Sequence, residues 1–406
     1  MRIAYLTQPY PPMISGAAIV AEKLASGMAE RGHDVLVIAA SDREYPYTIQ
    51  QNNLTILRLN SIHNPLRVKQ RFLLFSYFAI PKVLKKFQPD VIHIHEAFVA
   101  WTSIPYARRN HIPLISMVHQ IPTGSVSSMP NLLGLRSSAE SVIWMYERWL
   151  MRQCQTVVAP SQTTSKLLTS MTGMEVITIS NGIDLQTFHP PLPHDNVSAM
   201  RNKWHLPADV PLFLYIGRLD PEKHVDRLLD ACASVVQGTT VHLFIVGDGR
   251  EKEALIEQSR NLGIAERVHF VGFVSPKDGL PEIYRMANVF ITASKMETQG
   301  IVLLEAAASG LPIVAVNATS IPEIVHDGIN GFLADPHDIG TFNHALNMLV
   351  NNSELARAMG RESRLQAERH DIHSSWTLHE NLYRELISQP GIIPVDDNAN
   401  YPAHQD

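Results

Sequence analysis

The sequence predicts an α/β protein built from two doubly wound domains. Its 406 residues are too many for one ordinary domain and suit two domains of roughly 180–200 residues each. Apolar runs of strand length alternate with helical segments along both halves, and such alternation indicates parallel sheets that are covered on both faces. The alternation pauses at Pro190–His194 (PPLPH) and then begins again, so this stretch is the predicted linker.

The overall composition is that of a globular protein, with 45% hydrophobic residues. The two cysteines, Cys154 and Cys232, are too few for a disulfide framework and fit a reducing compartment. The sequence begins with a short strand rather than a signal peptide, and no apolar run approaches the ~18–20 residues needed to span a bilayer. We therefore predict a cytoplasmic protein without a transmembrane helix.

Charge is distributed unevenly along the chain. Residues 1–190 contain 17 Lys and Arg against 11 Asp and Glu, a net charge of +6. Because the whole chain carries −5, the remaining residues carry −11. This asymmetry predicts that the first half faces an anionic partner or surface, whereas two ordinary solvated surfaces are the alternative interpretation.

The first half opens with a βαβ unit. Strand Ile3–Leu6 is followed by a Pro-rich turn, a loop around Gly16, an amphipathic helix and strand Val35–Ala40. The loop therefore lies at the carboxyl end of the first strand, where open α/β sheets bind ligands, and Gly16 would let the backbone approach a phosphate or sugar closely. The loop is not a GxGxxG fingerprint, so a tight turn without a ligand is the alternative. The further predicted strands of this half are Leu54–Leu59, Pro89–Glu96, Leu114–Val118, Thr156–Ala159 and Val176–Ile179.

Residues 67–86 interleave basic side chains with aromatic ones, and we predict a helical segment there. Its cations are Arg67, Lys69, Arg71, Lys82, Lys85 and Lys86. A basic, aromatic-rich helix can lie on an anionic membrane surface. The alternative is an ordinary amphipathic helix whose cations face water, and Pro81 inside the segment weakens the membrane interpretation.

Three polar residues, His95, Glu96 and His119, follow predicted strands at the same edge of the sheet as Gly16. A metal ion between them is conceivable, but nothing in their spacing requires one, and we predict no metal site. We expect His119 to act instead as a hydrogen-bonding or proton-handling group in the cleft. Residues 124–135 contain Gly, Ser and Pro and are predicted to form a mobile lid or an acceptor-binding loop.

The second half repeats the alternation of strand and helix. Its predicted strands are Leu212–Ile216, Val241–Val246, Val268–Val271, Val289–Ala293, Ile313–Val316 and Gly331–Ala334. After the fourth strand comes METQGIVLLEAAASGLP, in which Glu297 and Glu305 are eight positions apart and a helix starts near Gly300. Both carboxylates can face one cleft, with an anion-binding helix end between them. This layout suits a sugar nucleotide. The alternative is that Glu297 is only a carboxylate at the helix start and Glu305 only a solvated helix residue.

The diphosphate of a sugar nucleotide needs matching positive charge. No Asp-x-Asp follows a strand to hold Mg²⁺, but Arg218 and Lys223 lie in the loop after the strand Leu212–Ile216. Arg can bind two phosphate oxygens at once, and Lys adds a point charge. This indicates stabilisation of a departing nucleoside diphosphate without a metal ion. A surface ion pair with Asp220 or Glu222 is the alternative.

Several motifs of the second half occur in a characteristic order. They are Gly217-Arg218-Leu219 with Glu222-Lys223, Gly247-Asp248-Gly249, Gly272-Phe273-Val274, and Glu297-x7-Glu305 followed by Ala-Ser-Gly-Leu-Pro. Together with Asn181-Gly182-Ile183-Asp184 they resemble the retaining glycosyltransferases of family 4, over nearly the whole chain. The resemblance implies the GT-B fold, in which two Rossmann-like domains face each other across a cleft. Two positions differ from the usual pattern: Ser15 replaces a frequent Gly, and His224 replaces a frequent Gly or Asn.

The resemblance also implies roles for matching positions. Arg218 and Lys223 would bind the donor diphosphate, Glu297 would bind the sugar hydroxyls, and His119 would lie beside the reacting sugar. These four are the predicted catalytic residues. Glu305 would bind the ribose. Backbone groups of the loops at the strand ends would contact the phosphate or the sugar, and a pocket at the ends of two strands of the second half would hold the base. The residues of these further contacts are Gly16, Gly247, Phe273, Val274, Gln299, Gly300, Ile301 and Glu305.

The predicted activity is transfer of a hexose from a nucleoside diphosphate sugar to an acceptor hydroxyl, with retention, without metal or cofactor and without nucleic acid. Glu297-Thr298-Gln299-Gly300 looks like the form in enzymes that glycosylate diacylglycerol, which would place the protein at the inner face of the membrane. A soluble sugar or a polysaccharide or cell-envelope intermediate is the alternative acceptor, and a nucleotide-sugar epimerase is a further alternative.

We expect an acceptor-side domain at 1–189, a donor-side domain at 190–370, a helix at 371–388 that crosses back to the first domain, and a flexible tail at 389–406.

Overall fold

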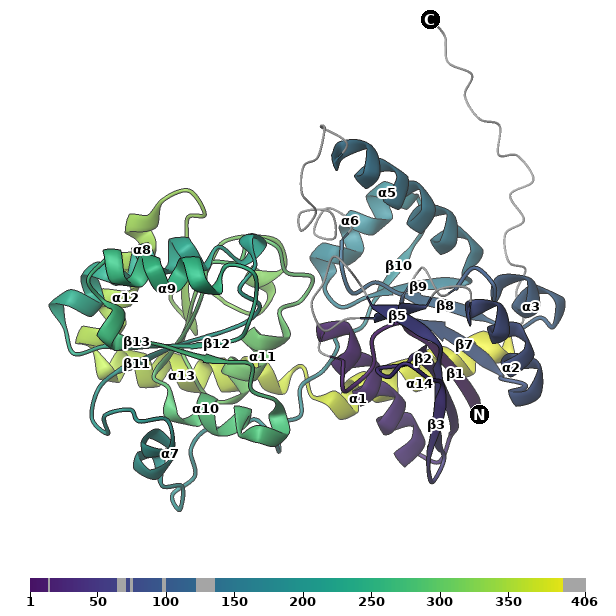
Figure 1. Ribbon diagram of the computed structural model, residues 1–406, viewed down its shortest axis with the longest axis horizontal. Coiled ribbons are helices and arrows are strands. Elements are labelled where there is room, and N and C mark those ends of the chain that lie inside the picture. The colour runs from purple at the N-terminus through teal and green to yellow at the C-terminus, as the bar shows by residue number, and fades with distance from the viewer. Residues whose placement is uncertain (14, 64–70, 74–75, 97–99, 122–135, 390–406) are drawn as a thin grey trace, which may run out of the picture.

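The computed structural model describes residues 1–13, 15–63, 71–73, 76–96, 100–121 and 136–389. These residues form two α/β lobes that lie side by side, each with a central sheet and helices on both of its faces (Figure 1). The predicted acceptor-binding loop at 124–135 and the predicted tail beyond residue 389 lie outside the described residues. None of the described helices is both long and apolar enough to cross a bilayer.

The first lobe contains an eight-stranded sheet in the order β10-β9-β8-β7-β1-β2-β4-β3. All neighbours are parallel except β3 and β4. Its strands are β1 (Arg2–Leu6), β2 (Asp34–Ala40), β3 (Tyr47–Gln51), β4 (Leu54–Leu59), β7 (Val91–Ile94), β8 (Leu114–Met117), β9 (Thr156–Ala159) and β10 (Val176–Thr178). The near-continuous apolar sequence of the central strands fits their burial on both faces.

Alternate residues of β1 show which helices cover which face of this sheet. Ile3 and Tyr5 pack with helices α1 (Gly16–Glu30) and α14 (Ile372–Ser388). Ala4 and Leu6 pack in a second cluster on the opposite face. Its helices are α2 (Ile80–Phe87), α3 (Ile104–Arg109) and α5 (Arg136–Gln153), while α6 (Gln162–Thr172) packs near the end of the sheet against β9 and β10.

The second lobe contains a six-stranded, fully parallel sheet in the order β13-β12-β11-β14-β15-β16. Its strands are β11 (Leu212–Ile216), β12 (His242–Val246), β13 (Val268–Gly272), β14 (Val289–Thr292), β15 (Ile313–Val316) and β16 (Gly331–Ala334). Its helices are α7 (Val197–Lys203), α8 (Val225–Gly238), α9 (Lys252–Asn261), α10 (Leu280–Met286), α11 (Ile301–Ala308), α12 (Ile339–Asn351) and α13 (Ser353–Glu368).

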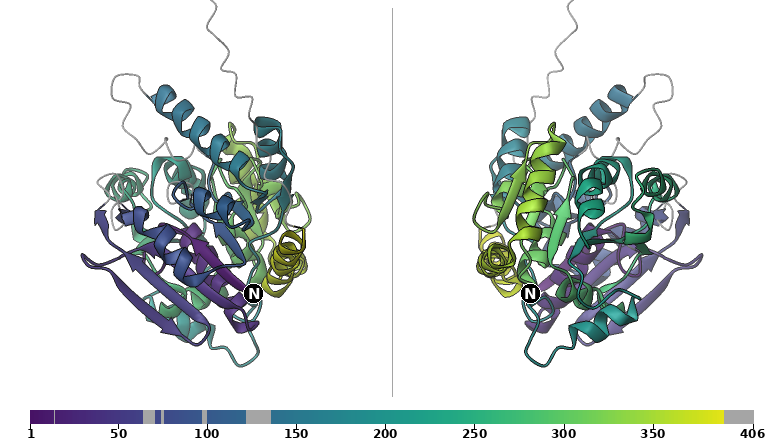
Figure 2. Two further views of the ribbon diagram at one scale, coloured as in Figure 1. Left: turned by 90° about the vertical axis from the view of Figure 1, so that its right-hand side faces the viewer. Right: turned by 90° about the vertical axis from the view of Figure 1, so that its left-hand side faces the viewer.

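The last helix, α14, packs on the first lobe (Figures 1 and 2). Trp376 packs directly on Gly27 of α1, where an added Cβ would lie 2.2 Å from the indole ring. Arg31 Nη1 forms an ion pair with Glu380 Oε2 at 2.8 Å. The two halves of the chain therefore share one hydrophobic core across this helix pair.

The prediction of one helical segment over 67–86 is wrong. Residues 64–70 and 74–75 lie outside the described chain, and Arg71–Leu73 is strand β6, which pairs antiparallel with β5 (Ser61–His63). The helix α2 begins only at Ile80, with Pro81 at its start, where the missing N–H of proline costs no hydrogen bond. The proline therefore marks a helix start rather than an interruption.

Candidate active site

Tightly packed glycines fix the loop that carries Arg218 and Lys223. A Cβ at Gly247, whose φ is +147°, would lie 1.8 Å from the carbonyl oxygen of Gly217. The Leu219 amide donates to the Asp248 carbonyl at 3.0 Å, so the loops after β11 and β12 are joined through their backbones. The glycine motifs therefore hold this loop at the carboxyl edge of the sheet, where α/β sheets bind ligands.

Lys223 and Glu297 meet inside the site. The Lys223 ammonium lies 2.6 Å from Glu297 Oε1 and 3.4 Å from Ser294 Oγ. Both side chains of the ion pair are less than a fifth exposed. A fixed cation and a fixed carboxylate thus stand next to each other, one suited to a phosphate oxygen and the other to a hydroxyl.

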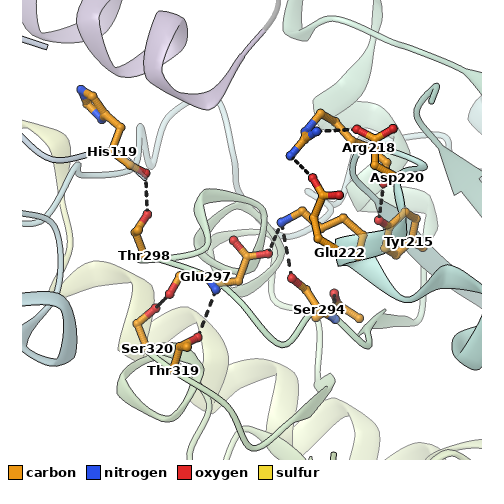
Figure 3. A network of polar contacts seen from close by, with 12 residues as sticks. His119, Tyr215, Arg218, Asp220, Glu222, Ser294, Glu297, Thr298, Thr319 and Ser320 are labelled. Carbon is orange, nitrogen blue, oxygen red and sulfur yellow. Dashed lines mark hydrogen bonds and ion pairs between the residues drawn. The ribbon is translucent and has the colours of Figure 1, made fainter. Parts of the chain in front are cut away.

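Arg218 is held by carboxylates of its own loop. Its two terminal nitrogens bind Asp220 and Glu222, the second at 2.6 Å, and its side chain is 43% exposed (Figure 3). This is the ion pair that the sequence offers as the alternative interpretation. A diphosphate would have to compete with two carboxylates for the guanidinium, so Arg218 as a donor ligand stays a prediction.

Two helix N-termini face each other across the lobes. Helix α11 follows Gly300, whose φ is +83°, and α1 begins at Gly16 after Ser15, whose hydroxyl accepts from the Ala18 amide at 3.0 Å. A Cβ at Gly16 would lie 3.8 Å from Ile301 Cδ1. Because both helix ends carry partial positive charge, the space beside them favours an anion.

Glu305 is buried rather than open. Only 5% of the residue is exposed, and its Oε2 accepts a hydrogen bond from the Tyr284 hydroxyl at 2.8 Å. Burial raises the pKa of Glu305, while Lys23 of the first lobe and the Tyr284 hydroxyl act in the opposite direction. Tyr284 cannot be identified as a site residue from the sequence, because its position in α10 is typical of an ordinary core residue. Ribose binding by Glu305 stays a prediction.

Thr298 and Gln299 join the two lobes. The Thr298 hydroxyl donates to the His119 carbonyl at 2.9 Å, and the Thr298 carbonyl accepts from the Ser161 hydroxyl at 2.5 Å. The Gln299 amide donates to Ser180 Oγ at 2.6 Å and is 3% exposed. The Gln299 side chain is thus occupied by the first lobe, and a donor contact through its backbone stays a prediction.

His119 belongs to a buried cluster of histidine and tyrosine. Its backbone carbonyl meets Thr298 (Figure 3), whereas its Nε2 lies 2.8 Å from His95 Nδ1. His93 Nδ1 lies 2.7 Å from the Tyr383 hydroxyl of α14. Burial, with a smaller contribution from His379, lowers the pKa of His119 to about 4. The imidazole is therefore neutral at pH 7, and its place beside the sugar stays a prediction.

The remaining predicted contacts differ in exposure. Phe273 is 45% exposed directly after β13, Val274 is buried, and Gly272 has a φ of +76°. The position after Lys223 is explained as well, because His224 has a φ of +51°, a conformation that glycine and asparagine adopt most easily. Among the described residues, no group of three or more His, Cys, Asp or Glu is placed to hold a metal ion.

Two known protein families match the chain. Residues 14–187 match the family described as Glycosyltransferase Family 4, and residues 196–366 match the family described as Glycosyl transferases group 1. The two matches divide at the predicted linker and together leave only the termini and a short central segment unmatched.

Curated relatives and a solved structure agree with these matches. An alpha-monoglucosyldiacylglycerol synthase of Streptococcus pneumoniae is 28% identical over 82% of this chain and 75% of its own length. A GDP-mannose-dependent alpha-mannosyltransferase of Mycobacterium tuberculosis is 29% identical over 85% of this chain and 86% of its own. The sucrose-phosphate synthase of Thermosynechococcus elongatus has a TM-score of 0.80 at 21% identity, over 95% of this chain and 99% of that one, which confirms the fold as GT-B. The chain belongs to the glycosyltransferases of family 4 and is a glycosyltransferase.

Proposed function

We propose that this enzyme transfers a hexose from a nucleoside diphosphate sugar to an acceptor hydroxyl, with retention and without a metal ion. The observation that carries the proposal is the arrangement of Lys223 and Glu297 beside two facing helix N-termini. A diphosphate placed there would meet an ammonium group and free backbone amides, and its sugar would meet the Glu297 carboxylate. These groups supply the charge that the leaving diphosphate needs.

In the proposed step, the bond between the anomeric carbon and the β-phosphate oxygen breaks, and the acceptor oxygen bonds to that carbon on the same face. The acceptor proton passes to the departing diphosphate. Lys223 and the amides at the start of α11 stabilise the charge that develops on the phosphate, so no protein base is required. Closure of the two lobes would exclude water and bring Gly16 and His119 to the donor.

The further donor contacts follow the same geometry. Glu305 would accept hydrogen bonds from the ribose hydroxyls, held in place by Tyr284. Gly247, Phe273 and Val274 at the ends of β12 and β13 would line the base pocket. Arg218 would release its carboxylates to bind the diphosphate.

The relatives support retention in one respect. The names of both the Streptococcus and the Mycobacterium enzyme specify the alpha configuration. Transfer from an alpha-linked donor to an alpha product is retention. An NMR assay of the product's anomeric configuration tests this for the present enzyme, and a beta product from an alpha donor would refute it.

The test of the whole proposal is turnover with UDP-, GDP- and ADP-hexoses in the presence and absence of EDTA. We expect one donor to be favoured and EDTA to leave the rate unchanged. Loss of activity with EDTA and its return with Mg²⁺ would contradict the role given to Lys223 and the helix ends. A change of the donor sugar without any acceptor would favour an epimerase instead.

For the acceptor we propose a membrane lipid of the diacylglycerol type. The relative from Streptococcus is a synthase of a glucosylated diacylglycerol, and the first half of this chain carries a net charge of +6. Turnover should therefore be faster with diacylglycerol in mixed micelles than with soluble sugars. A preference for soluble sugars or for a cell-envelope intermediate would replace this acceptor while leaving the donor chemistry intact.

A further inference from the structure

Helix α5 of the first lobe exposes an apolar stripe. Val142 is 58% exposed, Met145 64% and Trp149 45%. These residues are three and four positions apart, so they lie on one face of the helix. The buried face of the same helix carries Leu150, which packs with α2 and α3. Figure 1 shows α5 at the outer edge of this lobe.

The helices on this side of the sheet expose only positive charge in their described side chains. The exposed cations are Lys82, Lys85 and Lys86 of α2, Arg108 and Arg109 of α3, and Arg148 and Arg152 of α5. Arg108 donates to Gln153, which places the end of α3 against the end of α5. The apolar stripe is thus bordered by cations from its own helix and its neighbour.

Among the side chains that the structure describes on these helices, one is acidic, and it is Glu147 on α5. Burial, and to a lesser extent the nearby Glu96, raise the pKa of Glu147 to about 8. The carboxyl group is therefore mostly protonated at pH 7 and adds little negative charge to this side of the lobe.

Two further exposed rings lie at the edge of the sheet that borders the cleft. Phe78 is 61% exposed and precedes α2, and Trp101 is 37% exposed and precedes α3. Their rings meet edge to face with centroids 5.5 Å apart. Because helices of a doubly wound sheet start at its carboxyl edge, these rings lie on the side where an acceptor would enter.

We propose that the stripe Val142, Met145 and Trp149, together with Arg148 and Arg152 of the same helix and the exposed cations of α3 and α2, is a docking face for a bilayer that contains anionic phospholipid. Apolar side chains would enter the acyl boundary while the cations bind lipid phosphates. A second copy of the chain fits less well, because an isologous contact would oppose like charges. Such docking would serve the lipid-acceptor activity proposed above and rests on it for its purpose.

Co-sedimentation with vesicles tests the docking face. We expect the full-length protein to bind vesicles of phosphatidylcholine mixed with phosphatidylglycerol at low salt, and to be released by high salt or by omitting phosphatidylglycerol. Arg148→Gln with Arg152→Gln should weaken binding roughly 25-fold, at about fivefold for each cation. Binding to neither kind of vesicle, or equal binding to both, would overturn the proposal.

The apolar contact has its own test with a matched control. Met145→Glu should weaken vesicle binding roughly tenfold or more, because it places a charge in the acyl boundary. Leu365→Glu on α13 of the second lobe, where Leu365 is 52% exposed, should leave it unchanged. Unaltered binding by Met145→Glu, or a Met145-dependent dimer in sedimentation velocity without vesicle binding, would overturn the proposal.

A fluorescent label shows the depth of insertion. Cys154 and Cys232 are both buried, so Met145→Cys adds one accessible thiol for an environment-sensitive dye. Its emission should shift to the blue with anionic vesicles, whereas the same dye at Leu365→Cys should not respond.

Hexosyl transfer to a soluble short-chain acceptor separates the docking face from the proposed function. If transfer persists while vesicle binding is absent, only the docking face is refuted. If transfer fails while the protein still binds vesicles, only the proposed function is refuted.

Discussion

The two lobes line their sides of the cleft with different chemical groups. The second lobe presents charges, Lys223 against Glu297 and Arg218 against two carboxylates, on loops that glycines press together. The first lobe presents mainly neutral groups behind its strand ends, namely the buried imidazoles of His93 and His95 and the half-buried imidazole of His119, and Lys23 near Glu305 is an exception. Charge is thus concentrated where a diphosphate is expected, and neutral hydrogen bonding where an acceptor is expected.

This difference separates two tasks. A donor with a fixed anionic group can be held by point charges whose positions the backbone dictates. On the first lobe, burial lowers the pKa of the imidazoles, so they can support the shape of the cleft without adding charge. A substitution in one lobe therefore leaves the other lobe as an internal reference.

The largest expected effect is loss of the second lobe's loop packing. Gly247→Ala places a methyl group 1.8 Å from the Gly217 carbonyl in a conformation that alanine rarely adopts, and we expect a cost of about 4 kcal/mol or more in unfolding free energy. Urea denaturation measures this. Gly238→Ala at the end of α8 meets open space and should change stability by about 0.5 kcal/mol or less. Equal effects of the two would show that the loops are not rigidly packed.

The next effect concerns the charge on the donor side. Lys223→Met removes the cation and leaves the Glu297 carboxylate without its partner, and we expect kcat/KM to fall about 10²–10³-fold with the fold retained. Steady-state kinetics and circular dichroism measure the two quantities. Lys277→Met replaces an exposed lysine of the same lobe and should have no kinetic effect. A similar loss in both variants would remove Lys223 from the site.

The first lobe should respond to acid instead. Burial lowers the pKa of His379 to about 4, so between pH 6.5 and pH 4 the unfolded chain binds more protons at this position than the folded chain. Stability is therefore lost as pH falls, on the order of 2 kcal/mol between pH 7.5 and pH 5 for this residue. His379→Gln should reduce this loss in urea titrations. His344→Gln, at an exposed position of α12, should not reduce the loss, and an unchanged acid loss in His379→Gln would contradict the assignment.

Sequence patterns located most of the fold because buried parallel strands are continuous apolar runs. The strands Leu54–Leu59, Leu212–Ile216 and Ile313–Val316 have the predicted bounds. Strand β3 was not predicted, since Tyr47–Gln51 is a half-exposed edge without apolar continuity. The hairpin of β5 and β6 was missed for the same reason, because three-residue strands carry too little pattern.

The site divides in the same way. Lys223 and Glu297 could be brought together from motif and strand order alone, because both follow carboxyl ends of parallel strands. The contact between His93 and Tyr383 could not, since it joins residues 290 positions apart through the packing of α14 on the first sheet. Tyr284 and Glu305 likewise meet only because the folded second lobe brings a side chain of α10 within reach of one from α11. Local pattern does not encode such contacts.

The smallest expected effect tests that last contact. Tyr284→Phe removes the hydroxyl that donates to Glu305, leaving the carboxylate free to turn, so the donor KM should rise about tenfold with little change in kcat. The loss also raises the pKa of Glu305 further, and the acid limb of kcat/KM should move to higher pH. Tyr106→Phe is the matched control, because its hydroxyl donates to the Leu84 carbonyl within the first lobe. If kcat falls and KM stays unchanged, Glu305 acts in the chemical step rather than in donor binding.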